Sequence, residues 1–247
     1  MDGHVLVTAP DDRRTYLADH LAEVRDRLSR ACAAADRAPD SVTLLPVTKF
    51  FPASDVALLR ELGCTEFGES REQDASPKVA EIGTDGVRWH MIGRLQRNKA
   101  KAVAAWAHAI HSVDTDRLVT ALGKAVAGAV DNGDRTADLD VYVQVSLDGD
   151  THRGGVDRED LEALTAQVSE TSGLRLAGLM AVPPLGADAD ASFEDLQRLH
   201  TQVLASHPGA TGLSAGMTGD LEEAVRHGST CVRVGTAILG PRPITSP

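Results

Sequence analysis

The chain has 247 residues, of which 42% are hydrophobic and 3% aromatic, and its formal net charge is −11. This length is that of one large domain with its own core, and an α/β barrel commonly has this size. The negative charge argues against a general surface for nucleic acid or anionic membrane, because phosphates would be repelled, although a local pocket can still hold a small phosphate.

Helical and strand patterns alternate along the chain. Apolar residues at helical spacing predict an amphipathic first helix over residues 12–35. Apolar runs then predict eight strands, over residues 42–48, 65–68, 87–93, 109–113, 139–147, 174–182, 211–215 and 231–237. Helical patterns between them cover residues 53–62, 96–107, 116–130, 157–171, 192–206 and 219–227, and loops are expected over 131–138 and 183–191.

This alternation predicts a parallel sheet, and eight units in one domain predict a closed (β/α)8 TIM barrel with an extra N-terminal helix. We expect residues 1–247 to form that single domain, with frayed tails at 1–11 and 241–247. A doubly wound open sheet is the alternative, but no GxGxxG motif follows the first strand.

The cysteines and the first residues of the chain indicate which cellular compartment the protein occupies. Cys32, Cys64 and Cys231 are far apart and show no CxxC spacing, which argues against a disulfide framework or a structural metal site. The first residues lack a basic region and a long apolar region, and no stretch is long enough to span a bilayer. We therefore expect a cytoplasmic protein without metal or membrane partners.

Lys49 closes an apolar strand where the strand meets a loop. Burial lowers a lysine pKa, and a neutral amine can form a Schiff base with an aldehyde. The alternative is a lysine that only marks the strand's exit into solvent. Other unusual residues also fall at the carboxyl ends of predicted strands, the face of a barrel that carries chemistry. Turns need Gly and Ser in any case, so each of these residues alone is weak evidence.

Two loops suggest a phosphate cradle, one after the seventh strand and one after the eighth. Small residues let backbone N–H groups approach an anion, and barrels often bind phosphate between these two loops. Gly216 and Gly235 would allow the close approach, and Thr218 and Thr236 would supply hydroxyls. The alternative is N-capping by Thr218 and a tight turn at Gly235.

Two polar residues lie within predicted strands. Arg233 is costly there unless it meets a partner, which is either an interior carboxylate or a ligand heteroatom. An arginine beside a pyridine nitrogen would keep that nitrogen unprotonated. His90 is either a satisfied core residue or a ligand contact. The remaining histidines share no metal-ligand spacing.

Several motifs occur in the order found in one known family. They are residues 45–49 (LPVTK), 67–70 (FGES), 90–99 (HMIGRLQRNK), 178–183 (GLMAVP), 213–218 (LSAGMT) and 228–238 (GSTCVRVGTAI). From its first helix to about Arg242, the chain resembles the YggS/PROSC family of pyridoxal phosphate homeostasis proteins. The resemblance implies an alanine-racemase-like barrel of fold type III without the second domain of the racemases.

The resemblance also implies a site for pyridoxal 5'-phosphate (PLP), held as an aldimine on Lys49, with Arg233 near the ring nitrogen. It implies storage or supply of the cofactor, with no catalytic residues and with PLP-dependent apo-enzymes as candidate recipients; we expect a monomer. The expected cofactor-binding residues are Lys49 (the Schiff base), Ser70, His90, Gly93, Met180, Ser214, Met217, Thr218, Arg233, Gly235 and Thr236. Of these, Ser214, Met217 or Thr218, Gly235 and Thr236 are the phosphate contacts.

Three departures from the family pattern matter. Ser70 replaces an asparagine, so that side-chain contact is lost, shortened or water-bridged, and Thr48 replaces a serine before Lys49. Arg153 stands where the family has a lysine, and it keeps the charge but cannot form an aldimine. Lys78 aligns with a family lysine, and we interpret it as a surface helix residue.

Two other functions compete with a carrier of PLP. An amino-acid racemase needs bases on both faces of the substrate carbon, and the related racemases use a tyrosine opposite the lysine. The only tyrosines here, Tyr16 and Tyr142, are not obviously placed for that role. A barrel that binds another phosphorylated metabolite, with Lys49 as a charge partner only, is the third interpretation.

Overall fold

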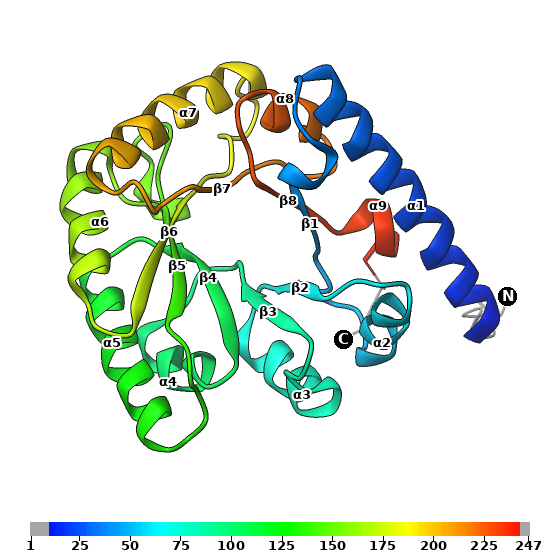
Figure 1. The fold of residues 1–247 in the computed structure, drawn as a ribbon, viewed down its shortest axis with the longest axis horizontal. Helices are drawn as coiled ribbons and strands as arrows, with labels where there is room; N and C mark the ends of the chain where they lie inside the picture. The colour runs from blue at the N-terminus through cyan, green and yellow to red at the C-terminus, as the bar shows by residue number, and fades with distance from the viewer. Residues whose placement is uncertain (1–9, 243–247) are drawn as a thin grey trace, which may run out of the picture.

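The computed structural model describes residues 10–242. In this part of the chain, eight parallel strands form one sheet in the order β1-β8-β7-β6-β5-β4-β3-β2, surrounded by helices (Figure 1). The strands are β1 Thr43–Pro46, β2 Glu66–Glu69, β3 Arg88–Met91, β4 Ala107–Val113, β5 Leu139–Gln144, β6 Leu174–Met180, β7 Gly212–Ser214 and β8 Cys231–Val234. A parallel bridge between Val47 and Gly68 joins the two edge strands, so the predicted (β/α)8 barrel is confirmed.

The α-helices of the described residues are α1 Pro10–Ala34, α2 Ala53–Glu61, α3 Glu72–Ile82, α4 Ala100–Ala104, α5 Asp116–Asp131, α6 Leu161–Glu170, α7 Ala189–Ser206, α8 Leu221–Arg226 and α9 Thr236–Leu239. The predicted extra helix is α1, which lies outside the barrel alongside α8 and α9 (Figure 1). It buries Leu17, Leu21 and Leu28 against them. This packing places α1 behind the loops that follow β7 and β8.

Two hydrophobic layers lie between the strands and the helices. One joins the outer face of β3 to β7 with α4 to α7, and the other joins β1, β2 and β8 with α1, α2 and α8. Trp89 and Phe67 are fully buried in the second layer, with ring centroids 5.7 Å apart. Because aliphatic side chains fill these layers, apolar burial stabilises the barrel from outside and leaves its interior to other residues.

Three elements differ from the sequence predictions. In place of the predicted helix over 96–107, the chain forms a 3₁₀ turn, Arg97–Lys99, and then the short helix α4. The predicted strand over 231–237 ends at Val234, because α9 begins at Thr236. Helix α3 is missing from the helical ranges predicted between the strands, although Lys78 within it was expected on a surface helix; Pro77 removes a backbone donor there. Buried Ala75 and Val79 nevertheless pack α3 onto the barrel.

The expected tails over 1–9 and 243–247 lie outside the described residues, whereas Pro10 and Asp11 lie in α1. The helices between residues 10 and 242 include none with the length and apolar character required to cross a membrane.

The contact between β6 and β7 depends on glycine. A Cβ on Gly178 would lie 1.7 Å from the carbonyl oxygen of Gly212, so any side chain there would push the two strands apart. We expect Gly178→Ala to lower the free energy of unfolding by about 3 kcal/mol. Urea unfolding would measure the change. Gly128→Ala, in α5 with open space around its Cβ, is the matched control and should raise stability by about 0.5–1 kcal/mol. Equal stability of the two variants would contradict the assignment.

Candidate functional site

Lys49 lies in a turn directly after β1, at the carboxyl end of the barrel, and is half-buried. Burial lowers the pKa of its amine, and the nearby charges of Arg242 and Arg233 lower it further, while the Glu69 carboxylate opposes them. A lowered pKa increases the fraction of neutral amine, which is the nucleophilic form. This environment supports the reactive interpretation of Lys49 over a simple exit into solvent.

The residue after Lys49 holds an unusual backbone conformation. Phe50 has φ 71°, in the left-handed region that bulky residues rarely adopt. The guanidinium carbon of Arg242 lies 3.7 Å from the centroid of the Phe50 ring, and Lys49 Nζ lies 5.9 Å from it. Both cations are within cation–π range of one ring, so the strained turn gathers positive charge around the amine.

A buried ion pair anchors the residue before Lys49. Lys78 Nζ donates to Glu69 Oε1 at 2.7 Å and to the Thr48 carbonyl at 2.8 Å, and Thr48 Oγ1 donates to the same carboxylate oxygen at 2.6 Å. Thr48 and Glu69 are fully buried, and Lys78 is 9% exposed. The interpretation of Lys78 as a surface residue is therefore wrong, because α3 turns it inward to neutralise Glu69.

The loops after β7 and β8 lie against each other. Thr218 Oγ1 and Thr236 Oγ1 are 3.5 Å apart, and a Cβ on Gly235 would lie 3.3 Å from the Val47 carbonyl oxygen. Gly216 has φ 90°, and a Cβ there would meet Ala224 at 2.6 Å, so this turn requires glycine. The two loops thus present hydroxyls and small residues side by side, as expected of a phosphate cradle.

Thr218 does not cap α8, since that helix begins at Leu221 and Asp220 precedes it. Asp220 Oδ1 instead accepts a hydrogen bond from the Met217 N–H at 2.6 Å. From α1, Arg27 donates to the Thr218 carbonyl at 2.6 Å and pairs with Glu222 at 2.5 Å. These contacts fix the loop after β7, and nothing local to Arg27 in the sequence reveals its role.

A line of buried polar side chains crosses the barrel interior. Arg233 Nη1 donates to Ser214 Oγ at 2.7 Å, and Ser214 Oγ lies 2.8 Å from His111 Nδ1. His111 Nε2 lies 3.0 Å from His90 Nδ1, and His90 Nε2 lies 3.2 Å from Glu66 Oε2. Sequence reasoning missed His111 and Glu66; inward alternation along β2 and β4 is the signal that could have found them.

Arg233 has no interior carboxylate as a partner in the described part of the chain. Besides Ser214, its guanidinium donates to the Ala181 carbonyl at 3.1 Å, so both acceptors are neutral. Burial lowers the pKa of Arg233 and lowers that of His111 well below its ordinary value. Burial raises the pKa of Glu66, but His90 and Arg88 more than compensate and bring it to about 2.

The remaining predicted residues have different surroundings. A Cβ on Gly93 would lie 2.2 Å from the Ser70 carbonyl oxygen, so these two loops pack backbone to backbone. Met180 is 2% exposed at the end of β6, whereas Met217 is exposed. His90 is buried inside the barrel, a geometry that favours the core interpretation over a ligand contact.

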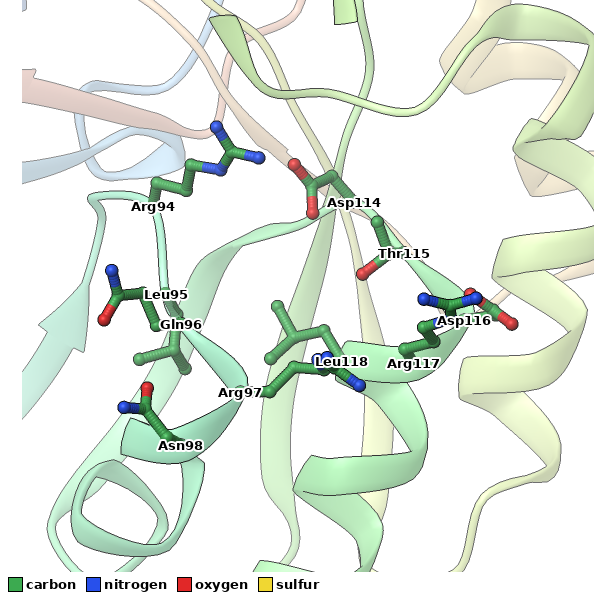
Figure 2. Close-up of a pocket in the computed structure, with 10 residues that line it drawn as sticks. All are labelled: Arg94, Leu95, Gln96, Arg97, Asn98, Asp114, Thr115, Asp116, Arg117 and Leu118. Carbon is green, nitrogen blue, oxygen red and sulfur yellow. The ribbon is translucent and has the colours of Figure 1, made fainter. Parts of the chain in front are cut away.

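A polar cleft of about 1300 Å³ begins directly after Gly93. It is lined by the residues that follow β3 and β4, and Figure 2 shows Arg94 and Asp114 pointing toward each other there. Arg94, Arg97 and Arg117 have no ion-pair partner among residues 10–242. The cleft beside the site therefore holds three guanidinium groups together with the carboxylates of Asp114 and Asp116.

The chain matches the family described as alanine racemase, N-terminal domain, over residues 20–243. It is 54% identical to the pyridoxal phosphate homeostasis protein of Mycobacterium bovis over 254 residues, 98% of each chain. The Escherichia coli protein of the same name is 36% identical over 235 residues, 92% of this chain and 97% of the relative. Among solved structures, PipY of Synechococcus elongatus with PLP bound has a TM-score of 0.77 and 33% identity, covering 91% of this chain and 100% of that chain.

The buried ion pair should dominate local stability. Lys78→Met leaves Glu69 buried without its cation, and we expect the free energy of unfolding to fall by about 3–5 kcal/mol in urea titrations. Lys101→Met, which removes an exposed lysine in α4, is the control and should stay within about 0.5 kcal/mol of the parent. Similar losses in the two variants would show that Lys78 does not hold Glu69.

The buried histidines should make stability depend on pH. Because the folded-state pKa of His111 is lowered, the unfolded chain binds more protons than the folded chain below the unfolded pKa of about 6.5. The stabilising effect of neutral His111 is therefore present above that pH and is lost on acidification. Between pH 7 and pH 5.5, we expect this residue to lower the free energy of unfolding by about 1 kcal/mol. In His111→Gln, the free energy of unfolding should fall by about 1 kcal/mol less over this pH range than in the parent. An equal fall in the two proteins would contradict the prediction.

Proposed function

The chain belongs to the family of the alanine racemase N-terminal domain and, within it, to the pyridoxal phosphate homeostasis proteins, and on that basis we propose that it binds PLP and stores or supplies it. The observation that carries the proposal is the amine of Lys49, whose pKa is lowered at the carboxyl end of the barrel beside Arg233. The binding of PLP by PipY, the relative at 33% identity, supports the same cofactor.

The residues present fit this cofactor. When bound, PLP supplies an aldehyde that a neutral primary amine captures with loss of one water. Lys49 Nζ would hold the aldehyde carbon, and the adjacent hydroxyls of Thr218 and Thr236 with the backbone at Gly235 would hold the phosphate. Arg233, a buried cation with two neutral acceptors, would face the ring nitrogen and keep it unprotonated.

The placement of the tyrosines favours a carrier over a racemase. Racemisation requires a base on each face of the substrate carbon, and Lys49 supplies one. Tyr16 stacks on His20 within α1. Tyr142 stacks on His111 and lines a pocket formed by the amino-terminal ends of the strands, opposite the end that carries Lys49. Neither tyrosine is placed as the second base, and we propose a protein without catalytic turnover.

We propose that PLP-dependent apo-enzymes in the cytoplasm receive the cofactor from a monomeric carrier. The cleft with Arg94, Arg97 and Arg117 lies beside the proposed site and would attract an acidic surface of a recipient. Transfer of PLP to an apo-enzyme should then slow as salt concentration rises, since salt screens exposed charges.

Loss of the reactive amine should abolish covalent attachment. We expect Lys49→Ala to show no absorbance band of lysine-bound cofactor and to gain no borohydride-stable mass, while its circular dichroism matches the parent. Lys101→Ala, which removes an exposed lysine, should behave as the parent protein. Specific reductive trapping at one other site in Lys49→Ala would show that Lys49 is not the point of attachment.

Space at Gly235 should govern phosphate retention. A larger side chain would crowd the Val47 carbonyl and fill the gap between the two loops, so we expect Gly235→Leu to weaken PLP affinity about tenfold or more. Equilibrium dialysis measures the affinity. Gly209→Leu, at a position with open space in the loop before β7, is the control and should bind normally. Unchanged affinity in Gly235→Leu would count against the cradle.

A further inference from the structure

We propose that His111 is a positioning residue of the cofactor site. It orients the Ser214 hydroxyl toward the Arg233 guanidinium and, through His90, connects that guanidinium to Glu66 at the opposite end of the barrel. The role of Arg233 toward a cofactor ring rests on the proposed function, whereas the connection itself rests on the geometry of the chain alone.

The ionised end of the line determines the direction of its hydrogen bonds. Glu66 Oε2 lies 3.2 Å from His90 Nε2, close enough for charge attraction although the pair lacks hydrogen-bond geometry, and this favours the His90 hydrogen on Nε2, facing the carboxylate. In this direction, His90 Nδ1 accepts from His111 Nε2–H, and His111 Nδ1 accepts from the Ser214 hydroxyl. The lone pairs of Ser214 Oγ are left for Arg233, which can only donate. The proposed direction therefore places the single hydrogen of His111 on Nε2.

This direction stabilises a buried charge whose hydrogen-bond acceptors are both neutral. Arg233 is 5% exposed, and its hydrogen-bond acceptors among residues 10–242 are a hydroxyl and a carbonyl. Each group along the line turns its lone pair toward Arg233 and its hydrogen toward Glu66. Aligned hydrogen bonds of this kind polarise one another in a low-dielectric interior. The negative charge of Glu66 thus supports the guanidinium from a distance and holds it in one position.

Neighbouring strands enclose His111 and restrict its ring. The Tyr142 ring from β5 stacks on it with centroids 4.3 Å apart, and the His90 ring from β3 meets it edge-on at 5.2 Å. His90 and Arg233 are the charged or titratable groups that lower its pKa after burial, followed by His108 from β4. The Glu66 end of the line opens into a pocket of about 280 Å³ at the amino-terminal mouth. The line therefore joins that mouth to the buried side of the proposed PLP site.

The same geometry changes the role expected of Ser214. Its side chain is fully buried, and its hydroxyl is engaged with both His111 and Arg233. We assign this hydroxyl to holding Arg233, and the phosphate contacts to the exposed loops that follow β7 and β8.

The first test uses the cofactor-free protein, so it does not depend on PLP binding. Long-range ¹H–¹⁵N spectra of histidine-labelled protein near pH 7 report which ring nitrogen carries the hydrogen. We expect His111 to be neutral with its hydrogen on Nε2. A hydrogen on Nδ1, or a doubly protonated ring, would reverse the line and overturn the proposal. The result of this test can still be interpreted if the protein does not bind PLP. Failure to bind PLP would contradict the proposed function and not the hydrogen-bond direction.

The second test compares two substitutions in the PLP-loaded protein. His111→Leu leaves the Ser214 hydrogen without an acceptor, whereas the amide oxygen of His111→Asn can take the place of Nδ1. We expect His111→Leu to weaken PLP retention about tenfold and to shift the pH midpoint of the absorbance change of lysine-bound cofactor. His111→Asn should recover most of both. Parent-like behaviour of a folded His111→Leu, or equal changes in the two variants, would overturn the positioning role.

Discussion

Burial of positive charge at one end of the barrel is the constraint on which the proposed site depends. Partial burial lowers the pKa of Lys49, and Arg242 and Arg233 lie close enough to lower it further. Lys78 adds little to this repulsion, because Glu69 neutralises it. Burial and the two arginines together favour the neutral form of the Lys49 amine. A neutral amine beside two hydroxyl-bearing loops is what a phosphorylated aldehyde requires.

The barrel separates the tasks of stability and chemistry. Apolar layers between strands and helices supply most of the burial, so the interior can hold a line of polar groups from Glu66 to Arg233. Helix α1 contributes to both, because it completes one apolar layer and its Arg27 side chain donates a hydrogen bond to the loop after β7. The loops that would hold a phosphate are thus tied to the scaffold rather than left to the cofactor to order.

Local patterns predicted the barrel, since each strand and most helices carry their own periodicity, and the family resemblance placed Lys49 and the two loops. Contacts between distant segments were beyond such patterns. Lys78 was expected on the surface of a helix because its neighbours do not reveal that this face of α3 packs on the barrel, and Arg27 meets Thr218 across 191 positions. The contact between His90 and His111 could be recognised only by knowing which faces of the strands point into the barrel. The interior line was therefore visible only in the structure.

The central claim is that Lys49 captures PLP through its own neutral amine. The most direct measurement is to mix the parent protein with PLP, reduce with borohydride and locate the modified peptide by mass spectrometry. We predict one modification, on Lys49, whose yield rises with pH through a range below the ordinary lysine pKa of about 10.4. Folded protein that gains no label would contradict the account and leave a barrel that binds a different phosphorylated ligand.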